Sequence, residues 1–209
     1  MAFVDRDLAV PIESSARPTF IAVVGPSGAG KDSLIAVARE RLAEDDRFVF
    51  ARRIVTREAD PDLEDHDCLD AKGFQAAAEA GRFCVSWQAH GLSYGLPASL
   101  LDDYASGRVV IANVSRKALD EIAAGFPALH VVEVTAPGHV LMERLLSRGR
   151  ETREEVARRV ARAIEQGVPA GGWTYRKIEN AGGLDEAAAD FVRTLRSIAA
   201  RPGEDTAAG

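Results

Sequence analysis

The chain has 209 residues, of which 46% are hydrophobic, and its formal net charge at pH 7 is -6. This size fits one compact domain with a substantial core, and the negative charge disfavours a general nucleic-acid-binding protein. No apolar run approaches the ~20 residues of a membrane span, and the first residues lack the apolar segment of a secretory signal. The two cysteines, Cys68 and Cys84, make neither a disulfide framework nor a C-x-x-C pair, so we expect free thiols and a cytoplasmic protein.

Hydrophobic periodicity and turn residues divide the chain into alternating strands and helices. In chain order, the first half is predicted to contain a polar tail over 1–18, a strand over 19–24, a helix over 31–43, a strand over 48–54, an irregular charged segment over 56–70, a helix over 72–80, a strand over 82–87, a glycine-containing connection over 88–97 and a helix over 98–105.

The second half continues the same alternation. It is predicted to contain a buried strand over 109–113, a helix over 116–124, a strand over 130–135, a helix over 137–146, a charged helix over 153–166, a short strand over 175–178, an amphipathic helix over 184–199 and a disordered tail over 201–209. Such alternation predicts an α/β fold in three layers, with helices on both faces of a central parallel sheet. Ligands are then expected at the carboxyl ends of the strands.

The most informative segment is a glycine-rich loop directly after the first strand. It reads Gly25, Pro26, Ser27, Gly28, Ala29, Gly30 and Lys31. The spacing G-x-x-x-x-G-K between a strand and a helix is that of a phosphate-binding loop, whose glycines let backbone N–H groups surround an anion. Lys31 is expected to reach the β- and γ-phosphates of ATP. The alternative is a glycine turn ahead of an ordinary helix, but the flanking strand and helix favour the ATP site over 25–33.

One position departs from the usual pattern of this loop. The residue after the lysine is normally Ser or Thr, but here it is Asp32, followed by Ser33. A carboxylate at this position can bind Mg²⁺ directly or through water. It can instead be a charge that the helix dipole favours. Because an unpaired carboxylate would repel ATP phosphates, we expect a cation nearby and predict Asp32 as the Mg²⁺ ligand, with Ser33 as the alternative.

Further segments resemble guanylate-kinase-like P-loop kinases, and among them most closely the ribose 1,5-bisphosphate phosphokinase family. They are GPSGAGKDSL at 25–34, RRIVTR at 52–57, EDHD at 64–67, SWQAHGLSYGLP at 86–97, ANVSR at 112–116, RLLSRGRE at 144–151 and, more loosely, IEN at 178–180. The resemblance implies an enzyme that uses ATP and Mg²⁺ to phosphorylate the 1-phosphate of ribose 1,5-bisphosphate. The products would be 5-phosphoribosyl 1-diphosphate (PRPP) and ADP, as in phosphonate breakdown.

The same resemblance implies how the chain is organised. We expect one kinase domain over 19–200, with an acceptor lobe at about 54–97 and a lid at about 147–160. The partner would be a small phosphorylated sugar, with neither a nucleic acid nor a membrane involved. The sequence does not indicate an oligomeric state.

Two alternatives remain open at this point. The first is a guanylate kinase or another nucleoside-monophosphate kinase, but the acidic positions that would read guanine are replaced here by segments 85–87 and 111–115. The second is a guanylate-kinase-like binding module without catalysis. The intact Lys31 and the arginine-rich lid disfavour this second alternative.

Arginines supply the cations that phosphoryl transfer needs. By the resemblance, Arg53 and Arg57 bind the acceptor phosphate, since guanidinium groups suit bidentate phosphate contacts. The alternative is an ordinary solvated strand end. Arg144, Arg148 and Arg150 surround a glycine break and would close over the transferring phosphoryl group, so that they and Lys31 form the predicted catalytic set.

The other acceptor-site candidates follow the second and third predicted strands and one central strand. They are Glu64, Asp65, His66, Trp87, His90, Tyr94, Asn113, Ser115 and Arg116. Carboxylates at 64–65 suit ribose hydroxyls, whereas Tyr94 and a protonated His90 suit the 5-phosphate. The alternative for the aromatic residues is packing of a small lobe. No second ligand pair accompanies the segment 64–68, so it does not predict zinc. Arg158 and Arg159 follow glutamates four residues earlier, which favours a structural role in the helix.

Overall fold

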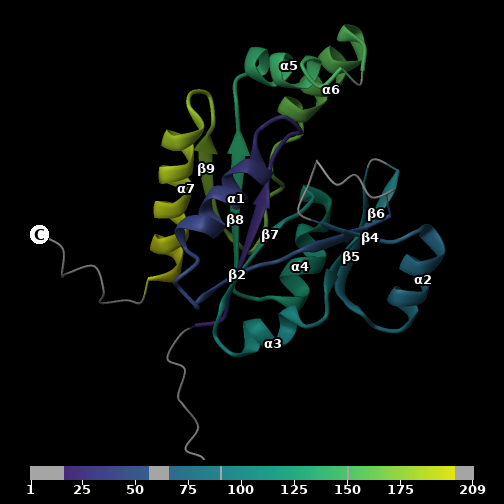
Figure 1. Ribbon diagram of the computed structural model, residues 1–209, viewed down its shortest axis with the longest axis vertical. Coiled ribbons are helices and arrows are strands. Elements are labelled where there is room, and N and C mark those ends of the chain that lie inside the picture. Colours follow the sequence, from purple (N-terminus) through teal and green to yellow (C-terminus); the bar gives the residue numbers. More distant parts are fainter. Residues whose placement is uncertain (1–16, 57–65, 90, 150, 201–209) are drawn as a thin grey trace, which may run out of the picture.

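The computed structural model describes residues 17–56, 66–89, 91–149 and 151–200, which form two sheets flanked by helices (Figure 1). The strands are β1 Thr19–Val24, β2 Phe48–Phe50, β3 Arg53–Val55, β4 His66–Cys68, β5 Phe83–Ala89, β6 Leu92–Pro97, β7 Val109–Asn113, β8 Leu129–Thr135 and β9 Thr174–Glu179. The helices are α1 Lys31–Arg41, α2 Ala71–Glu79, α3 Leu100–Ala105, α4 Leu119–Gly125, α5 Gly138–Leu146, α6 Arg153–Glu165 and α7 Leu184–Ala199, with a 3₁₀ turn η1 Arg116–Ala118.

The central sheet has the strand order β2-β7-β1-β8-β9, and all its neighbours pair in parallel. Its middle strand β1 reads TFIAVV and is buried throughout, as expected of a parallel strand covered on both faces. Ile21 and Val23 pack into a core with α1 and α7, whereas Phe20, Ala22 and Val24 pack into a core with α3 and α4. This alternation along β1 creates the three predicted layers.

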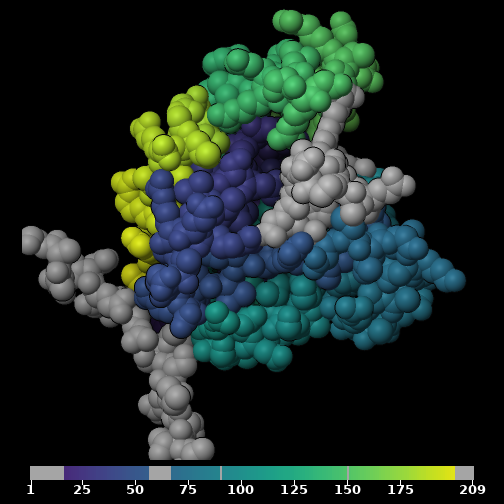
Figure 2. All heavy atoms as spheres, in the orientation of Figure 1, coloured from purple at the N-terminus to yellow at the C-terminus, as the bar shows by residue number. Residues whose placement is uncertain are grey.

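A second sheet was not predicted. Its strand order is β4-β3-β6-β5, and it lies beside α2 on one side of the central sheet (Figure 1). Its strands span much of the segment 54–97 that we assigned to the acceptor lobe. Figure 2 shows helices α5 and α6 at one end of this face of the molecule and the region around α2 at its side.

Two predictions of local structure were wrong in this region. The strand predicted over 48–54 is divided between the two sheets: Ala51 still donates a 2.8 Å hydrogen bond to Ile111 of β7, but Ile54 pairs with Gly95 of β6. A short apolar run fits either sheet, so its pattern does not reveal a change of partner. The irregular segment over 56–70 also contains β4.

The connection predicted over 88–97 is mostly strand β6, which forms an antiparallel hairpin with β5. Glycines suggested a loop, but they have specific places in the hairpin. Gly91 has φ +76° in the turn, a backbone conformation that favours glycine. Gly95 lies under the ring of Phe83, where an added Cβ would be 2.6 Å from Cδ1.

The predicted helices are confirmed, with small differences at their ends. Helix α6 begins at a capping box in which the Thr152 hydroxyl accepts from the Glu155 backbone and the Glu155 carboxylate accepts from the Thr152 backbone. Its apolar residues Val156 and Val160 are buried. Within the described ranges, no helix has both the length and the apolar character needed to cross a membrane.

We expect Phe126→Ala to lower the free energy of unfolding by about 3–5 kcal/mol, the usual cost of removing a buried aromatic ring. Phe126 is fully buried, 4.5 Å from the ring of Phe20 and 5.0 Å from that of Tyr104 between ring centroids. Urea unfolding would measure the change. The control Leu101→Ala removes a side chain that is 43% exposed and should cost about 0.5 kcal/mol or less. Equal losses in the two variants would contradict the assignment of Phe126 to the core.

Candidate functional site

The glycine-rich loop joins β1 to α1 and has little room for side chains. An added Cβ on Gly25 would be 2.0 Å from the Val134 carbonyl oxygen, and one on Gly30 would be 2.4 Å from Nδ2 of Asn180. Gly30 is also the N-cap of α1, with φ +88°, and as a glycine it has no side chain to cap the first N–H groups of the helix. These N–H groups and the helix dipole are therefore suited to bind an anion.

Lys31 is the first residue of α1 and lies against the loop. Its Nζ donates hydrogen bonds of 2.8 Å to the Gly25 carbonyl and 3.0 Å to the Pro26 carbonyl. The ammonium group is thus held over the loop that is expected to surround the phosphates.

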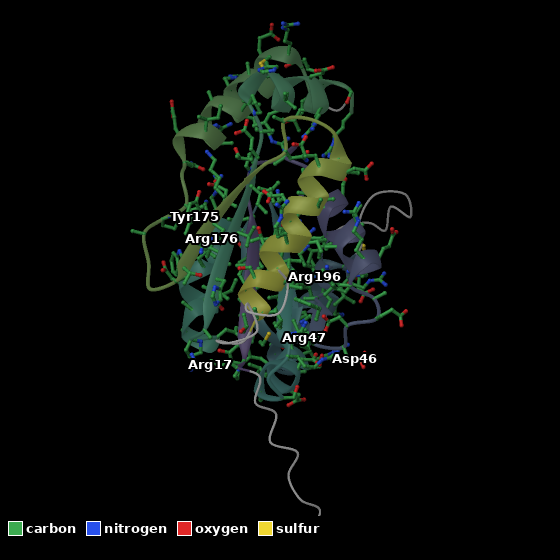
Figure 3. All side chains as sticks on the ribbon, turned by 90° about the vertical axis from the view of Figure 1, so that its left-hand side faces the viewer. Arg17, Asp46, Arg47, Tyr175, Arg176 and Arg196 are labelled. Atoms are coloured by element: carbon green, nitrogen blue, oxygen red, sulfur yellow. The ribbon has the colours of Figure 1, made fainter. Side chains whose placement is uncertain are left out.

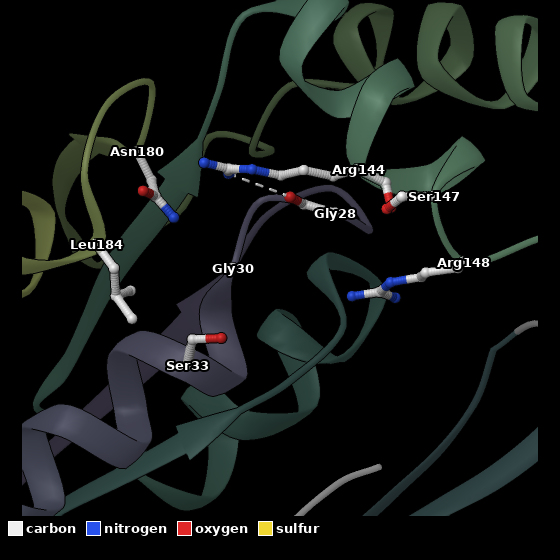
Figure 4. A pocket seen from close by; sticks show the side chains of 8 residues that line it. All are labelled: Gly28, Gly30, Ser33, Arg144, Ser147, Arg148, Asn180 and Leu184. Atoms are coloured by element: carbon white, nitrogen blue, oxygen red, sulfur yellow. Dashed lines mark hydrogen bonds between the residues drawn. The ribbon is translucent and has the colours of Figure 1, made fainter.

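A cavity of about 350 Å³ opens beside the loop, a volume within the range of small-molecule sites (Figure 4). Its lining residues come from the loop, α1, the end of α5 and the segment after β9: Gly28, Gly30, Ser33, Arg144, Ser147, Arg148, Asn180 and Leu184. Arg144 donates a 3.4 Å hydrogen bond to the Gly28 carbonyl. Two predicted lid arginines, Arg144 and Arg148, therefore share one cavity with the phosphate loop.

Asn180 was given no role by the sequence analysis, yet it connects this cavity to the loop. It follows β9 and is only 3% exposed. Its Nδ2 donates a 2.8 Å hydrogen bond to the Ala29 carbonyl, and its backbone N–H donates to Thr135 of β8. Its buried Oδ1 accepts no hydrogen bond from the described residues. A polar residue two positions after a predicted strand was the available signal, because such residues lie at the ligand-binding edge of the sheet.

Five predicted residues come together on the other side of the loop. Asp32 Oδ1 accepts a 2.6 Å hydrogen bond from Asn113 Nδ2 and lies 3.5 Å from Nη2 of Arg53. The Arg53 guanidinium carbon lies 5.9 Å from the centre of the Tyr94 ring, and this ring stacks on Trp87 at 5.4 Å. The loop, the end of β7 and the second sheet therefore meet at one cluster.

Ser115 and Arg116 make contacts of a different kind. The Ser115 hydroxyl caps η1 by accepting from the Lys117 backbone. Arg116 Nη2 donates a 2.6 Å hydrogen bond to Glu133 Oε1, and its Nη1 donates to the carbonyls of Ala163 and Gln166 at the end of α6. The guanidinium of Arg116 thus joins the end of α6 to β8, and the acceptor contact that we predicted for it stays a prediction.

Glu133 is the centre of this second network and was missed by the sequence analysis. It is buried in β8 and also accepts a 2.5 Å hydrogen bond from the Tyr175 hydroxyl. Tyr175 and Arg176 lie on the edge strand β9 (Figure 3). A glutamate inside an otherwise apolar strand was the signal, since a buried charge requires partners.

Several predicted site residues lie outside the described residues. These are Arg57, Glu64, Asp65, His90 and Arg150. The backbone of His66 is in β4 and pairs with Arg53, but its side chain is not described.

The donor set at the loop fits Mg²⁺ held together with ATP. In the described ranges, no three His, Cys, Asp or Glu side chains form a group that could hold a metal by themselves. Mg²⁺ is commonly bound by one or two carboxylates, water and the substrate phosphates. Asp32, whose side chain is 48% exposed beside the loop, suits that arrangement.

A ribose 1,5-bisphosphate phosphokinase PhnN from Brucella melitensis is 50% identical to this chain over 182 residues, which cover 87% of this chain and 94% of that protein. The chain belongs to the ribose 1,5-bisphosphate phosphokinase family. A family member from Chelativorans sp. is 48% identical over 184 residues, covering 87% of this chain and 86% of that protein. A search with protein-family models gives no match.

A solved structure of the guanylate kinase from Anaplasma phagocytophilum shares the fold. It superposes with a TM-score of 0.62 and 18% identity, covering 90% of this chain and 89% of that one. The predicted guanylate-kinase-like P-loop architecture is therefore confirmed. The phosphokinase family to which this chain belongs uses that architecture, with the loop at the carboxyl end of β1.

We expect tyrosinate formation at Tyr175 to be delayed to high pH. Burial, the hydrogen bond to Glu133 and the Glu133 charge raise the pKa of Tyr175 from 10 to about 12. Since the folded-state pKa is raised, the stabilisation is complete below pH 10 and is lost as the pH rises toward 12.

A pH titration of near-ultraviolet absorbance, with Tyr175→Phe subtracted, would measure this pKa. Glu133→Gln removes the charge and should lower it. An unchanged pKa in Glu133→Gln would contradict the proposed effect of the glutamate.

Proposed function

We propose that this chain transfers the γ-phosphoryl group of ATP to the 1-phosphate of ribose 1,5-bisphosphate, giving PRPP and ADP. The observation that carries the proposal is the junction at Asp32, where the phosphate loop directly contacts Arg53 and Asn113. This contact supports a donor site at the loop next to a cationic acceptor site at Arg53. The names of the curated relatives support this choice of substrate.

On the donor side, the loop N–H groups and Lys31 would hold the β- and γ-phosphates of ATP. Arg144 and Arg148 would close the cavity over the nucleotide and exclude water. Mg²⁺, held by Asp32 directly or through water, would neutralise charge on the β- and γ-oxygens. This placement of Mg²⁺ agrees with the half-exposed carboxylate beside the loop.

On the acceptor side, Arg53 would bind a phosphate of the sugar, with Tyr94 as a further hydrogen-bond donor. The attacking oxygen of a 1-phosphate is already anionic, so the reaction needs no strong general base. The main barrier is repulsion between two polyanions, about 4 kcal/mol for each pair of unit charges at ~4 Å and an effective dielectric constant of 20. Catalysis would therefore rest on positioning and cations.

The first test is the choice of acceptor. We expect Mg²⁺-dependent release of ADP from ATP when ribose 1,5-bisphosphate is present, with PRPP as the second product, and background release with GMP. A coupled ADP assay with product identification by mass spectrometry would measure both. Turnover only with GMP would instead indicate a divergent guanylate kinase. No turnover with either acceptor would favour a binding module.

The second test concerns the lid. Arg148→Ala should lower kcat by about 10²–10³-fold, because it removes a cation placed for the charge of the transferring phosphoryl group. The control is Arg153→Ala, at the exposed first position of α6 and outside the cavity lining. Steady-state kinetics at saturating substrates would compare the two variants. Equal kcat values for Arg148→Ala and Arg153→Ala would exclude a catalytic role for Arg148.

A further inference from the structure

The carboxylate of Asp32 joins three separate parts of the fold through a single oxygen. Asp32 is the second residue of α1, Asn113 is the last residue of β7, and Arg53 is the first residue of β3 in the second sheet. Oδ1 of Asp32 accepts the 2.6 Å hydrogen bond from Asn113 and is also the atom 3.5 Å from Arg53. Both contacts therefore fall on Oδ1.

Burial makes these contacts important for the two partners. Asn113 is 7% exposed, and the side chain of Arg53 is 13% exposed. A guanidinium this deep in the protein is costly to bury unless nearby carboxylates and hydrogen bonds compensate its charge. Hydrogen bonds to an ionised acceptor are short and strong, which agrees with the 2.6 Å distance from Asn113.

The usual residue at this position could not replace Asp32 in these contacts. A Ser or Thr hydroxyl is attached directly to Cβ, whereas a carboxylate oxygen is one bond further from the backbone. The hydroxyl also has no charge with which to attract Arg53. A hydroxyl at position 32 would therefore serve a metal ion but leave Arg53 and Asn113 without this partner.

We propose that Asp32 is a positioning residue for the acceptor: it holds Arg53 and Asn113 in the orientation that binds the sugar phosphate. The inference rests on the proposed function. A guanidinium has five N–H donors in a fixed fork, which suits Arg53 for contact with a phosphate as well as with a carboxylate. The first turn after the nucleotide loop thereby sets the geometry of the acceptor site.

The main test is Asp32→Ser, which restores the usual hydroxyl and removes the carboxylate. We expect the KM for ribose 1,5-bisphosphate to rise by about 10- to 100-fold, the usual effect of losing a hydrogen bond to a charged group. The KM for ATP should change by at most about twofold because the loop and Lys31 remain, and so should the Mg²⁺ concentration for half-maximal rate because the new hydroxyl can serve the metal ion. Steady-state kinetics with each component varied in turn would separate these quantities.

A matched control is Asp120→Ser. Asp120 is also the second residue of a helix that follows a strand of the central sheet, and it is exposed. It shares the favourable interaction with the helix dipole but not the contacts to Arg53 and Asn113. All three kinetic quantities should match the wild type in this control.

A charge exchange tests the contact itself. In Asn113→Asp alone, two carboxylates would face each other, and the acceptor KM should rise. The double variant combines Asp32→Asn with Asn113→Asp. The amide at position 32 can then donate a hydrogen bond to the carboxylate at position 113, so that the pair again has one hydrogen bond and one negative charge. We expect the double variant to recover part of the lost acceptor affinity, whereas independent effects would add. Thermal unfolding of each variant would verify that it is folded. If Asp32→Ser does not fold, the double variant tests the inference in its place.

The outcomes are distinct. An unchanged acceptor KM in Asp32→Ser, with a higher requirement for Mg²⁺, would overturn the inference and assign Asp32 to the metal alone. Additive effects in the charge exchange would also overturn it. Absence of turnover by the wild type with ribose 1,5-bisphosphate would overturn the proposed function itself, and the inference with it.

Discussion

The arrangement of the site depends on one constraint: the phosphate loop is packed closely between the end of β8 and Asn180. Gly25 lies against the Val134 carbonyl and Gly30 against the Asn180 amide, so neither position has room for a Cβ atom. Side-chain contacts from both sides then fix the loop: Lys31 bonds to its first carbonyls and Asn180 to the carbonyl of Ala29. An anion-binding backbone gains its selectivity from such rigidity, because its N–H groups point inward before the ligand arrives.

Two networks of charged and polar side chains join separate elements of the fold. One joins Asp32, Asn113 and Arg53 and lies on the side of the second sheet. The other joins Arg116, Glu133 and Tyr175 and includes the last carbonyls of α6. The first joins the first turn of α1 to β7 and to the second sheet, and the second holds the end of α6 on β8. In the function that we propose, the first would align the two anionic substrates and the second would anchor the helix that covers them.

The local pattern of apolar and turn residues predicted most helices and strands. It failed around the second sheet. The helices were predicted correctly because the spacing of their apolar residues shows which face of each helix is buried. The segment 48–54 passes from the central sheet to the second sheet, and 92–97 forms a hairpin strand despite its glycines. In the first case the deciding contact, Ile54 with Gly95, joins residues far apart in the sequence, which periodicity cannot detect. In the second, the glycines that suggested a loop are in the turn and under the ring of Phe83.

The sequence by itself determined the phosphate loop, the α/β architecture and the family, because each follows from residue types at fixed spacing along the chain. Lys31 and the glycines before it could be assigned without coordinates for this reason. The tertiary structure alone decided which side chains meet: Asp32 with Arg53 and Asn113, Arg116 with Glu133, and Asn180 with Ala29. These pairs are separated by many residues and depend on strand order and register. Burial then makes them specific, since a charge or amide removed from water must find a partner that the fold brings to it.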